Sequence, residues 1–224
     1  MAETRSVDTR ERILDAAERL FTANGFDGAS MRQITGAAGV NLASVNYHFG
    51  SKEALVQEVF RRRLAWLNTE RLRVLTALEQ AAGGKPLKPS QIVEGFFGTL
   101  LGMAQDEARG GVTFLRLLGR TLTDPADFIR TFLADEYQEV VERYKMALFK
   151  ALPNVPRAEI AWRFHFMLGA TSYAIAGTDA LRLVTDWQVD DEDATDRLDR
   201  LQPRLMSFLL GGLRAPLPKF EEMQ

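Results

Sequence analysis

The chain has 224 residues, and its 28 Lys and Arg nearly balance its 30 Asp and Glu, for a net charge of −2 at pH 7. This balance argues against indiscriminate binding to nucleic acid. The sequence contains no Cys, which excludes disulfides and thiolate metal sites and is compatible with a reducing cytoplasm. No apolar run reaches the roughly 20 residues that cross a bilayer, so we expect a cytoplasmic protein with no membrane partner.

The N-terminal residues indicate a helix and a small basic excess. Residues 1–73 carry a net charge of +2 and the remainder carries −4, which favours the N-terminal end for any contact with DNA. We expect residues 1–7 to form a loose arm. Apolar residues from Asp8 to Asn24 recur at helical spacing, and Gly25 follows where a helix C-cap belongs.

Two short helices joined by a tight turn are expected next. Ser30 and Gln33 have the spacing of a capping box, which opens the first of them. Gly39 lies where the chain must turn back, and Gly adopts a positive φ without steric cost. Asn41 can cap the second, which covers residues 42–48. This arrangement is typical of the helix-turn-helix, whose second helix enters the major groove of DNA.

The rest of the chain also indicates helices, with no alternating strand pattern, so we expect an all-α fold. Ser51 caps a long helix that runs to about Ala82, and a linker rich in Gly and Pro follows at residues 82–89. Because this long helix is the only continuous element expected between the N-terminal part and the later helices, we expect it to carry any movement between them. The later helices are expected at 89–107, 110–122, 125–152, 156–184 and 193–213.

The last two of these helices are apolar on more than one side. A helix with more apolar surface than one core face can use is buried twice, within its own domain and against a partner. We therefore expect a homodimer; the alternative is a central core helix in a monomer. The residues expected in or beside the dimer interface are Trp162, Tyr173, Leu205, Phe208 and Leu209.

The sequence carries no recognisable catalytic or metal-binding pattern. Its two histidines, His48 and His165, have no Ser-His-Asp order and no cluster of metal ligands around them. No Gly-rich phosphate-binding loop is present. We therefore expect neither an enzyme nor a metal site.

Large apolar side chains on the helices between residues 89 and 184 can line a ligand cavity, although simple core packing is the more common role for any one of them. A polar group within such a stripe is more informative, because a buried charge must be paired or must serve a ligand. Arg116 fits this description, and it can instead pair with Glu136 or Glu139. The expected cavity residues are Phe97, Leu100, Phe114, Arg116, Leu118, Tyr144, Phe164, His165 and Leu168.

One segment, Gly39 to Leu55, resembles the DNA-binding signature of the TetR family of bacterial transcription regulators. The likeness extends over residues 8–56. It implies a helix-turn-helix DNA-binding domain at 1–52 and a helical ligand-binding and dimerisation domain at 53–224. The residues expected on DNA are Ser30, Arg32, Leu42, Ala43, Ser44, Asn46, Tyr47, His48 and Lys52.

The position of each residue in the signature implies its role. Tyr47, His48 and Lys52 match positions that mostly hold phosphates, and the residues from Leu42 to Asn46 named above match positions near base edges. The resemblance therefore implies a cytoplasmic dimeric repressor that binds a palindromic operator in double-stranded DNA and is released by a small-molecule effector. The alternative is an interaction or sensor protein of the same fold without operator binding, and the intact phosphate-contacting residues argue against it.

A weaker likeness covers residues 114–119 and 162–170, which resemble the fatty-acid-responsive, PsrA-type branch of the family. It implies that the effector is a fatty acid or an acyl-CoA, with no permanent cofactor. Arg116 would then hold the acidic head of the effector at the mouth of the cavity.

Overall fold

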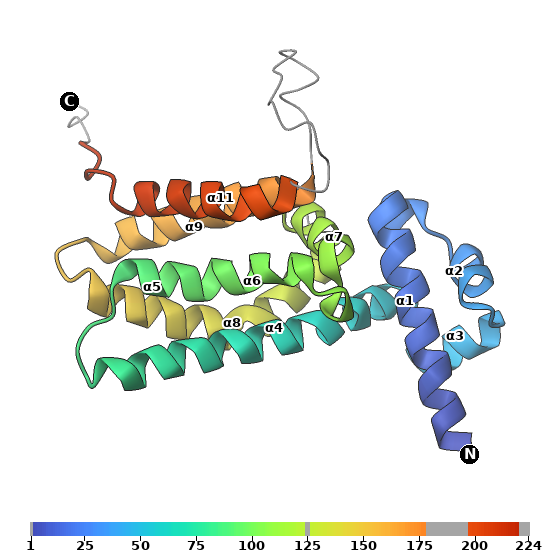
Figure 1. Ribbon diagram of the computed structural model, residues 1–224. Coiled ribbons are helices and arrows are strands. Elements are labelled where there is room, and N and C mark those ends of the chain that lie inside the picture. The colour runs from blue at the N-terminus through green and yellow to red at the C-terminus, as the bar shows by residue number, and fades with distance from the viewer. Residues whose placement is uncertain (1, 124–125, 178–196, 220–224) are drawn as a thin grey trace, which may run out of the picture.

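The computed structural model describes residues 2–123, 126–177 and 197–219, and its regular structure within these ranges is helical, with no β-strand. The expected all-α fold is therefore confirmed. Figure 1 shows a small group of N-terminal helices beside a bundle of longer helices. Within the described ranges, no helix combines the length and apolar character needed to span a bilayer.

The N-terminal half contains α1 (Ala2–Gly28), α2 (Met31–Ala38), α3 (Leu42–Phe49) and α4 (Lys52–Ala82). Because α1 already begins at Ala2, the expectation of a loose arm was wrong for residues 2–7. Gly25 adopts a φ of 72° and a ψ of 175°, so α1 is kinked where the sequence placed its end.

The turn between α2 and α3 is held by its caps and by α1. The Ser30 hydroxyl accepts from the backbone N–H of Gln33 at 3.2 Å, and the side-chain Oε1 of Gln33 accepts from the backbone N–H of Ser30 at 2.8 Å. These two hydrogen bonds confirm the capping box. Gly39 has a φ of 63°, as the tight turn requires. Arg12 of α1 donates to the carbonyls of Ala38 and Gly39, and so fixes the turn from outside.

The segment after the linker is less regular than expected. It consists of α5 (Pro89–Val93), a π-helical turn (Glu94–Gly98), α6 (Thr99–Gly102) and two 3-10 turns, Met103–Gln105 and Glu107–Arg109. The single helix expected at 89–107 is therefore interrupted. A π-helical turn is rare and is often found at functional sites, and this one carries Phe96 and Phe97.

The bundle is completed by α7 (Gly111–Thr123), α8 (Asp127–Ala151), α9 (Arg157–Ala176) and α11 (Arg197–Leu213). Gly177 caps α9 with a φ of 71°, so this helix ends before residue 184. The remainder of its expected length and the first residues expected in the last helix lie outside the described residues.

Two features of the packing hold the helices in place. Buried apolar side chains form one continuous cluster from Ile13 in α1 to Leu213 in α11. In the bundle, α7 lies very close to α9 at Gly119, where an added Cβ would come within 2.6 Å of the Ala176 nitrogen and 2.7 Å of the Ser172 oxygen. Only Gly permits this approach, because both atoms belong to the backbone.

Candidate nucleic-acid interface and apolar cavity

One face of α3 is anchored and the other is open to solvent. Val45 is fully buried and Phe49 is 8% exposed, so these two side chains hold α3 in the core. Away from this face Tyr47 is 84% exposed and Asn46 is exposed, and Leu42 in the first turn is 47% exposed. Exposed large side chains such as Tyr47 and Leu42 favour an interaction surface at this helix.

The polar groups of α3 divide into those engaged within the helix and those that are open. Asn41 Oδ1 accepts from the Ser44 amide at 2.8 Å and from the Ser44 hydroxyl at 2.9 Å, so Ser44 takes part in the N-cap. Ala43 and Asn46 are exposed, and His48 is half-buried. Ala43 and Asn46 are therefore open to the approach of a base edge.

The other expected DNA contacts lie on the flanking helices. Ser30 and Arg32 are exposed at the start of α2. Lys52 is the first residue of α4, and its Nζ lies 4.3 Å from the centroid of the Phe26 ring. This cation–π contact positions the ammonium group. The expected contacts thus come mainly from the first turns of α2, α3 and α4, where free backbone N–H groups favour anions.

The second feature is a cavity of about 590 Å³ inside the bundle, walled by α4, the π-helical turn, α6, α7, α8 and α9. Pockets of this size hold small organic ligands. The exposed Arg130 on α8 and His165 on α9 lie at its rim. Arg130 ion-pairs with Asp127 at 3.8 Å. The opening therefore lies between α8 and α9.

Part of the expected cavity set lines this space. Phe97, Leu100, His165 and Leu168 belong to its wall. Phe114 and Leu118, by contrast, are fully buried elsewhere. The Phe114 ring packs 5.9 Å from the Phe60 ring of α4, measured between centroids. These two side chains fill the core beneath α7 and do not reach the cavity.

Tyr144 and Phe164 form a layer behind the wall. Their ring centroids lie 5.1 Å and 5.0 Å from that of Phe96, which itself faces the cavity. The Tyr144 hydroxyl donates to the backbone carbonyl of Arg71 at 2.8 Å. Burial raises the pKa of Tyr144 to about 12, an effect that the nearby Arg71 partly opposes.

Arg116 does not hold a place in the cavity wall, so this expectation was wrong. The neighbouring positions 114, 115, 117 and 118 of α7 face inward, which leaves Arg116 exposed on the outside, next to Gly177. The suggested pairing with Glu136 is also absent, because Glu136 pairs with Arg61 at 3.2 Å.

The cavity's buried cation is instead Arg71 of α4, which was not among the expected cavity residues. Only 1% of this residue is exposed, and its Nε donates to the Phe96 carbonyl at 2.9 Å. The guanidinium carbon lies 3.8 Å from the centroid of the Phe96 ring. Burial lowers the pKa of Arg71, and the neighbouring Tyr137 and Tyr144 partly offset this effect.

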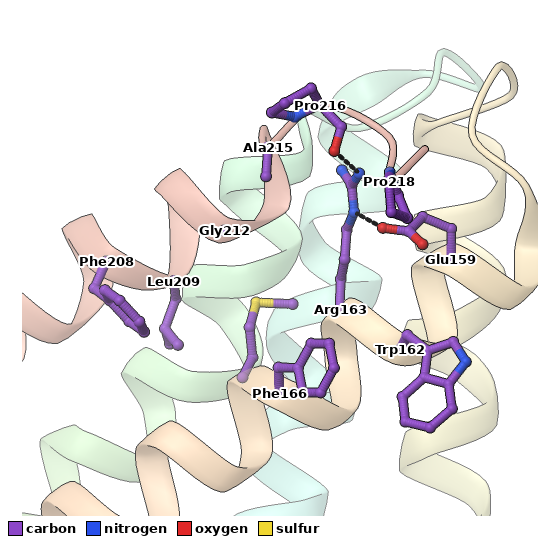
Figure 2. A pocket seen from close by; sticks show the side chains of 11 residues that line it. Glu159, Trp162, Arg163, Phe166, Phe208, Leu209, Gly212, Ala215, Pro216 and Pro218 are labelled. Carbon is purple, nitrogen blue, oxygen red and sulfur yellow. Dashed lines mark hydrogen bonds and ion pairs between the residues drawn. The ribbon is translucent and has the colours of Figure 1, made fainter. Parts of the chain in front are cut away.

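A third feature is a group of exposed aromatic side chains on α9 and α11. Trp162, Phe166 and Phe208 are 58%, 64% and 67% exposed, and they line a groove of about 710 Å³ (Figure 2). The rings of Trp162 and Phe166 stack with centroids 5.7 Å apart. Tyr173 is 46% exposed on the same helix. Phe166 was not among the residues expected at the interface.

The other expected interface residues lie beneath this surface. Leu205 and Leu209 are 7% and 1% exposed and pack into the core of their own chain. Arg163 is buried at one end of the groove, where it donates to Glu159 Oε1 at 2.8 Å (Figure 2). It also donates to the Leu213 carbonyl at 2.6 Å. It thereby fastens the end of α11 to α9.

Two family models match the chain. Residues 13–59 match the model described as bacterial regulatory proteins, tetR family, and residues 94–212 match the tetracyclin repressor-like C-terminal domain. The second match alone spans more than half of the chain. The chain belongs to the TetR family. The match over residues 13–59 agrees with the resemblance drawn from residues 39–55.

Individual TetR-family proteins are similar over different lengths. The transcriptional regulator UidR of Escherichia coli K12 is 42% identical over 57 residues, which cover 25% of this chain and 29% of UidR. The solved structure of the ketosteroid regulator KstR2 of Mycobacterium tuberculosis has a TM-score of 0.59 at 19% identity and covers 91% of this chain and 93% of its own. The solved structure of the fatty acid degradation regulator FadR of Bacillus halodurans has a TM-score of 0.56 at 14% identity. It covers 93% of this chain and 97% of its own. These structures establish the shared fold.

In this TetR-family chain, the N-terminal helices contact the bundle at α7 as well as through α4. Arg120 of α7 donates to the Thr22 carbonyl of α1 at 2.7 Å, and the Thr22 hydroxyl donates to the Thr113 carbonyl at 3.3 Å. Figure 1 shows α7 lying between the bundle and α1. The continuous helix α4 is therefore supplemented by packing contacts between α1 and α7.

Proposed function

We propose that this TetR-family protein is a cytoplasmic repressor that binds a palindromic operator as a homodimer and leaves it when a small effector enters the cavity. The observation that carries the proposal is α3, with its anchored inner face and its exposed Leu42, Asn46 and Tyr47. A helix presented in this way fits the major groove of double-stranded DNA. Residues 1–52 would form the reader, and 53–224 the effector and dimerisation domain.

Within the reader we assign two kinds of contact. Tyr47, His48 and Lys52, with Ser30 and Arg32 at the start of α2, would hold phosphates. The exposed positions of α3 would approach base edges, foremost Asn46, whose amide can both donate and accept. Phosphate contacts fix the register of a protein on DNA, whereas base contacts choose the sequence.

A second copy of the chain would cover the exposed aromatic side chains of α9 and α11. Trp162, Phe166 and Phe208 are each more than half exposed, and burying such side chains is the main source of affinity at protein interfaces. A two-fold dimer presents two copies of α3, so the operator would be an inverted repeat with half-sites about one helical turn apart or somewhat more.

The effector would be a molecule with a large apolar part. Support comes from the cavity wall, in which Phe97, Leu100 and Leu168 are apolar. A fatty acid or an acyl-CoA meets this requirement. The structural relatives named above include regulators named for ketosteroids and for fatty acid degradation, so the shared fold does not choose between these chemistries.

The test begins with DNA selected by the wild-type protein from a random-sequence library. A labelled duplex of the enriched sequence is then titrated, beside a duplex in which one half-site is scrambled. We expect an inverted repeat, two protomers per duplex, and weaker binding to the scrambled duplex. Tyr47→Ala should weaken binding, whereas Arg73→Ala, an exposed control on the far half of α4, should not. A library with no enriched sequence would favour the alternative, an interaction or sensor protein of the same fold.

A further inference from the structure

Arg71 is a buried cation without a counter-ion among the residues that the structure describes. Its Nη1 atom is buried and has no hydrogen-bond partner within the part of the chain that the structure describes, and no ion pair forms to its guanidinium there. The adjacent carboxylate, Glu70, is engaged elsewhere, because it ion-pairs with Arg73 at 2.6 Å. Charged groups are rarely buried in this way unless they are paired or serve a ligand.

The unpaired atom belongs to a side chain of the cavity wall. Arg71 lines the cavity, and its guanidinium is fixed by the Phe96 ring on one side and by the Phe96 carbonyl at Nε. The π-helical turn that contains Phe96 thus takes up one donor and leaves Nη1 available. The arginine is therefore oriented before any ligand enters, which lowers the cost of binding one.

A second observation points the same way. Thr171 of α9 also lines the cavity, is 2% exposed, and its hydroxyl oxygen is buried without a hydrogen-bond partner among the described residues. Two buried polar residues of a mostly apolar cavity wall, on α4 and α9, thus each carry an atom without a partner among the described residues, whereas the buried Ser172 hydroxyl donates to the Leu168 carbonyl. Ligand pockets combine an apolar wall with a few polar groups in this way.

We propose that the cavity takes an apolar monocarboxylic acid and that Arg71 binds its carboxylate, with Thr171 as a second hydrogen-bonding group. This assignment rests on the proposed effector function and specifies the chemistry of the ligand. A carboxylate supplies the charged acceptor that Nη1 lacks. A neutral apolar molecule of the same length would exclude water from the guanidinium without giving it an acceptor, and would bind more weakly for that reason.

The test measures binding to the full chain in the absence of DNA. Isothermal titration calorimetry compares dodecanoate, below the concentration at which it forms micelles, with dodecanol, which keeps the chain length and lacks the charge. The variant is Arg71→Gln, which retains an N–H donor for the Phe96 carbonyl. The matched control is Arg73→Gln on the same helix, where the arginine is exposed and ion-paired.

We expect wild-type protein and Arg73→Gln to bind dodecanoate with the same affinity and to bind dodecanol about tenfold more weakly or worse. Arg71→Gln should lose about tenfold or more of its affinity for dodecanoate and keep its affinity for dodecanol. This change in selectivity distinguishes a carboxylate contact from a purely structural role of Arg71. A purely structural role would weaken the binding of dodecanoate and of dodecanol alike.

Other outcomes overturn the assignment. Equal affinity of the wild type for both probes, an unchanged dodecanoate affinity in Arg71→Gln, or no binding of dodecanoate at all would each contradict it. None of these results bears on operator binding, which is measured separately on the selected duplex. A protein that binds dodecanoate through Arg71 but selects no DNA would instead contradict the proposed repressor function.

Discussion

Arg63 of α4 donates to Glu18 of α1 at 2.9 Å, although only 4% of Glu18 is exposed. The same guanidinium donates to the Ala108 carbonyl at 2.9 Å. One side chain therefore joins α1, α4 and the turn that precedes α7. Arg62 pairs with Glu18 as well and with Asp15 at 2.8 Å. The consecutive arginines of α4 thus fasten the reader to the bundle.

This junction gives the first prediction. Glu18→Gln should lower the free energy of unfolding by about 1–3 kcal/mol, because it leaves two partly buried guanidinium groups without their shared carboxylate. Asp15→Asn, a control at an exposed carboxylate that pairs with the same Arg62, should cost no more than about 0.5–1 kcal/mol. Urea unfolding measures both. Equal losses would show that the burial of Glu18 has no energetic importance.

Gly119 gives the second prediction, which concerns the route from the cavity to the reader. Ser172 and Ile175 line the cavity, and a Cβ at Gly119 would meet the Ser172 oxygen, the Ile175 side chain and the Ala176 nitrogen of α9. Gly119→Ala should therefore force α7 away from α9, lower the melting temperature, and alter how strongly an effector weakens DNA binding. Gly102→Ala, where the added Cβ meets open space, should be neutral or stabilising by about 0.5–1 kcal/mol. Identical behaviour of the two variants would contradict the close contact.

The third prediction concerns DNA contact. Lys52→Ala should weaken binding to all sequences and reduce the slope of log affinity against log salt by about one unit, because one phosphate contact is lost. Asn46→Ala should leave that slope unchanged and relax the preference at particular base pairs. Lys85→Ala, in the linker after α4, serves as the control. Titrations at several salt concentrations decide the matter, and an unchanged slope for Lys52→Ala would remove the phosphate assignment.

The fourth prediction concerns assembly. Phe208→Glu places a charge among the exposed aromatic side chains of α9 and α11 and should convert a dimer into monomers, because burying an unpaired carboxylate is costly. Met146→Glu, at an exposed apolar residue of α8 that lies outside the groove, should leave the dimer intact. Analytical ultracentrifugation distinguishes these states. Wild-type monomers at micromolar concentration would contradict the dimer directly.

The fifth prediction concerns alkaline pH. Because the pKa of Tyr144 is raised to about 12 in the folded protein and lies near 10 in an unfolded chain, the folded state holds this proton more tightly. The stability due to this shift is complete below pH 10 and is lost as the pH rises towards 12, with a fall of about 2–3 kcal/mol. Tyr144→Phe should lose about 1 kcal/mol at neutral pH, with its hydrogen bond to Arg71, and show a smaller alkaline fall. Urea unfolding at pH 8 and pH 11 measures the difference, and equal alkaline falls would contradict it.

The N-terminal elements could be predicted because their signals are local. The Ser30 cap, the positive φ at Gly39 and the Asn41 cap each depend on residues within three or four positions along the chain. The buried face of α3 followed from the spacing of Val45 and Phe49. These features needed no knowledge of how distant helices pack.

The cavity could be predicted only in part, because its wall depends on how distant helices meet. Arg116 was chosen for its apolar neighbours in sequence, yet the helical period turns it outward. The overlooked signal was Arg71, which lies four residues from both Leu67 and Leu75 within a buried apolar stripe of α4. A cation at such a position indicates a buried charge. The π-helical turn at Phe96, which fixes its orientation, has no comparable signal in the sequence.

The central claim is that an effector in the cavity releases the protein from DNA. The most direct measurement is the fluorescence anisotropy of a pre-formed complex between the full chain and its selected duplex, as dodecanoate is added. We predict that dodecanoate dissociates the wild-type complex and that the Arg71→Gln complex, equally tight at the start, requires about tenfold or more dodecanoate. A wild-type complex that persists while calorimetry shows dodecanoate bound would contradict the claim, because the cavity would then be uncoupled from the reader.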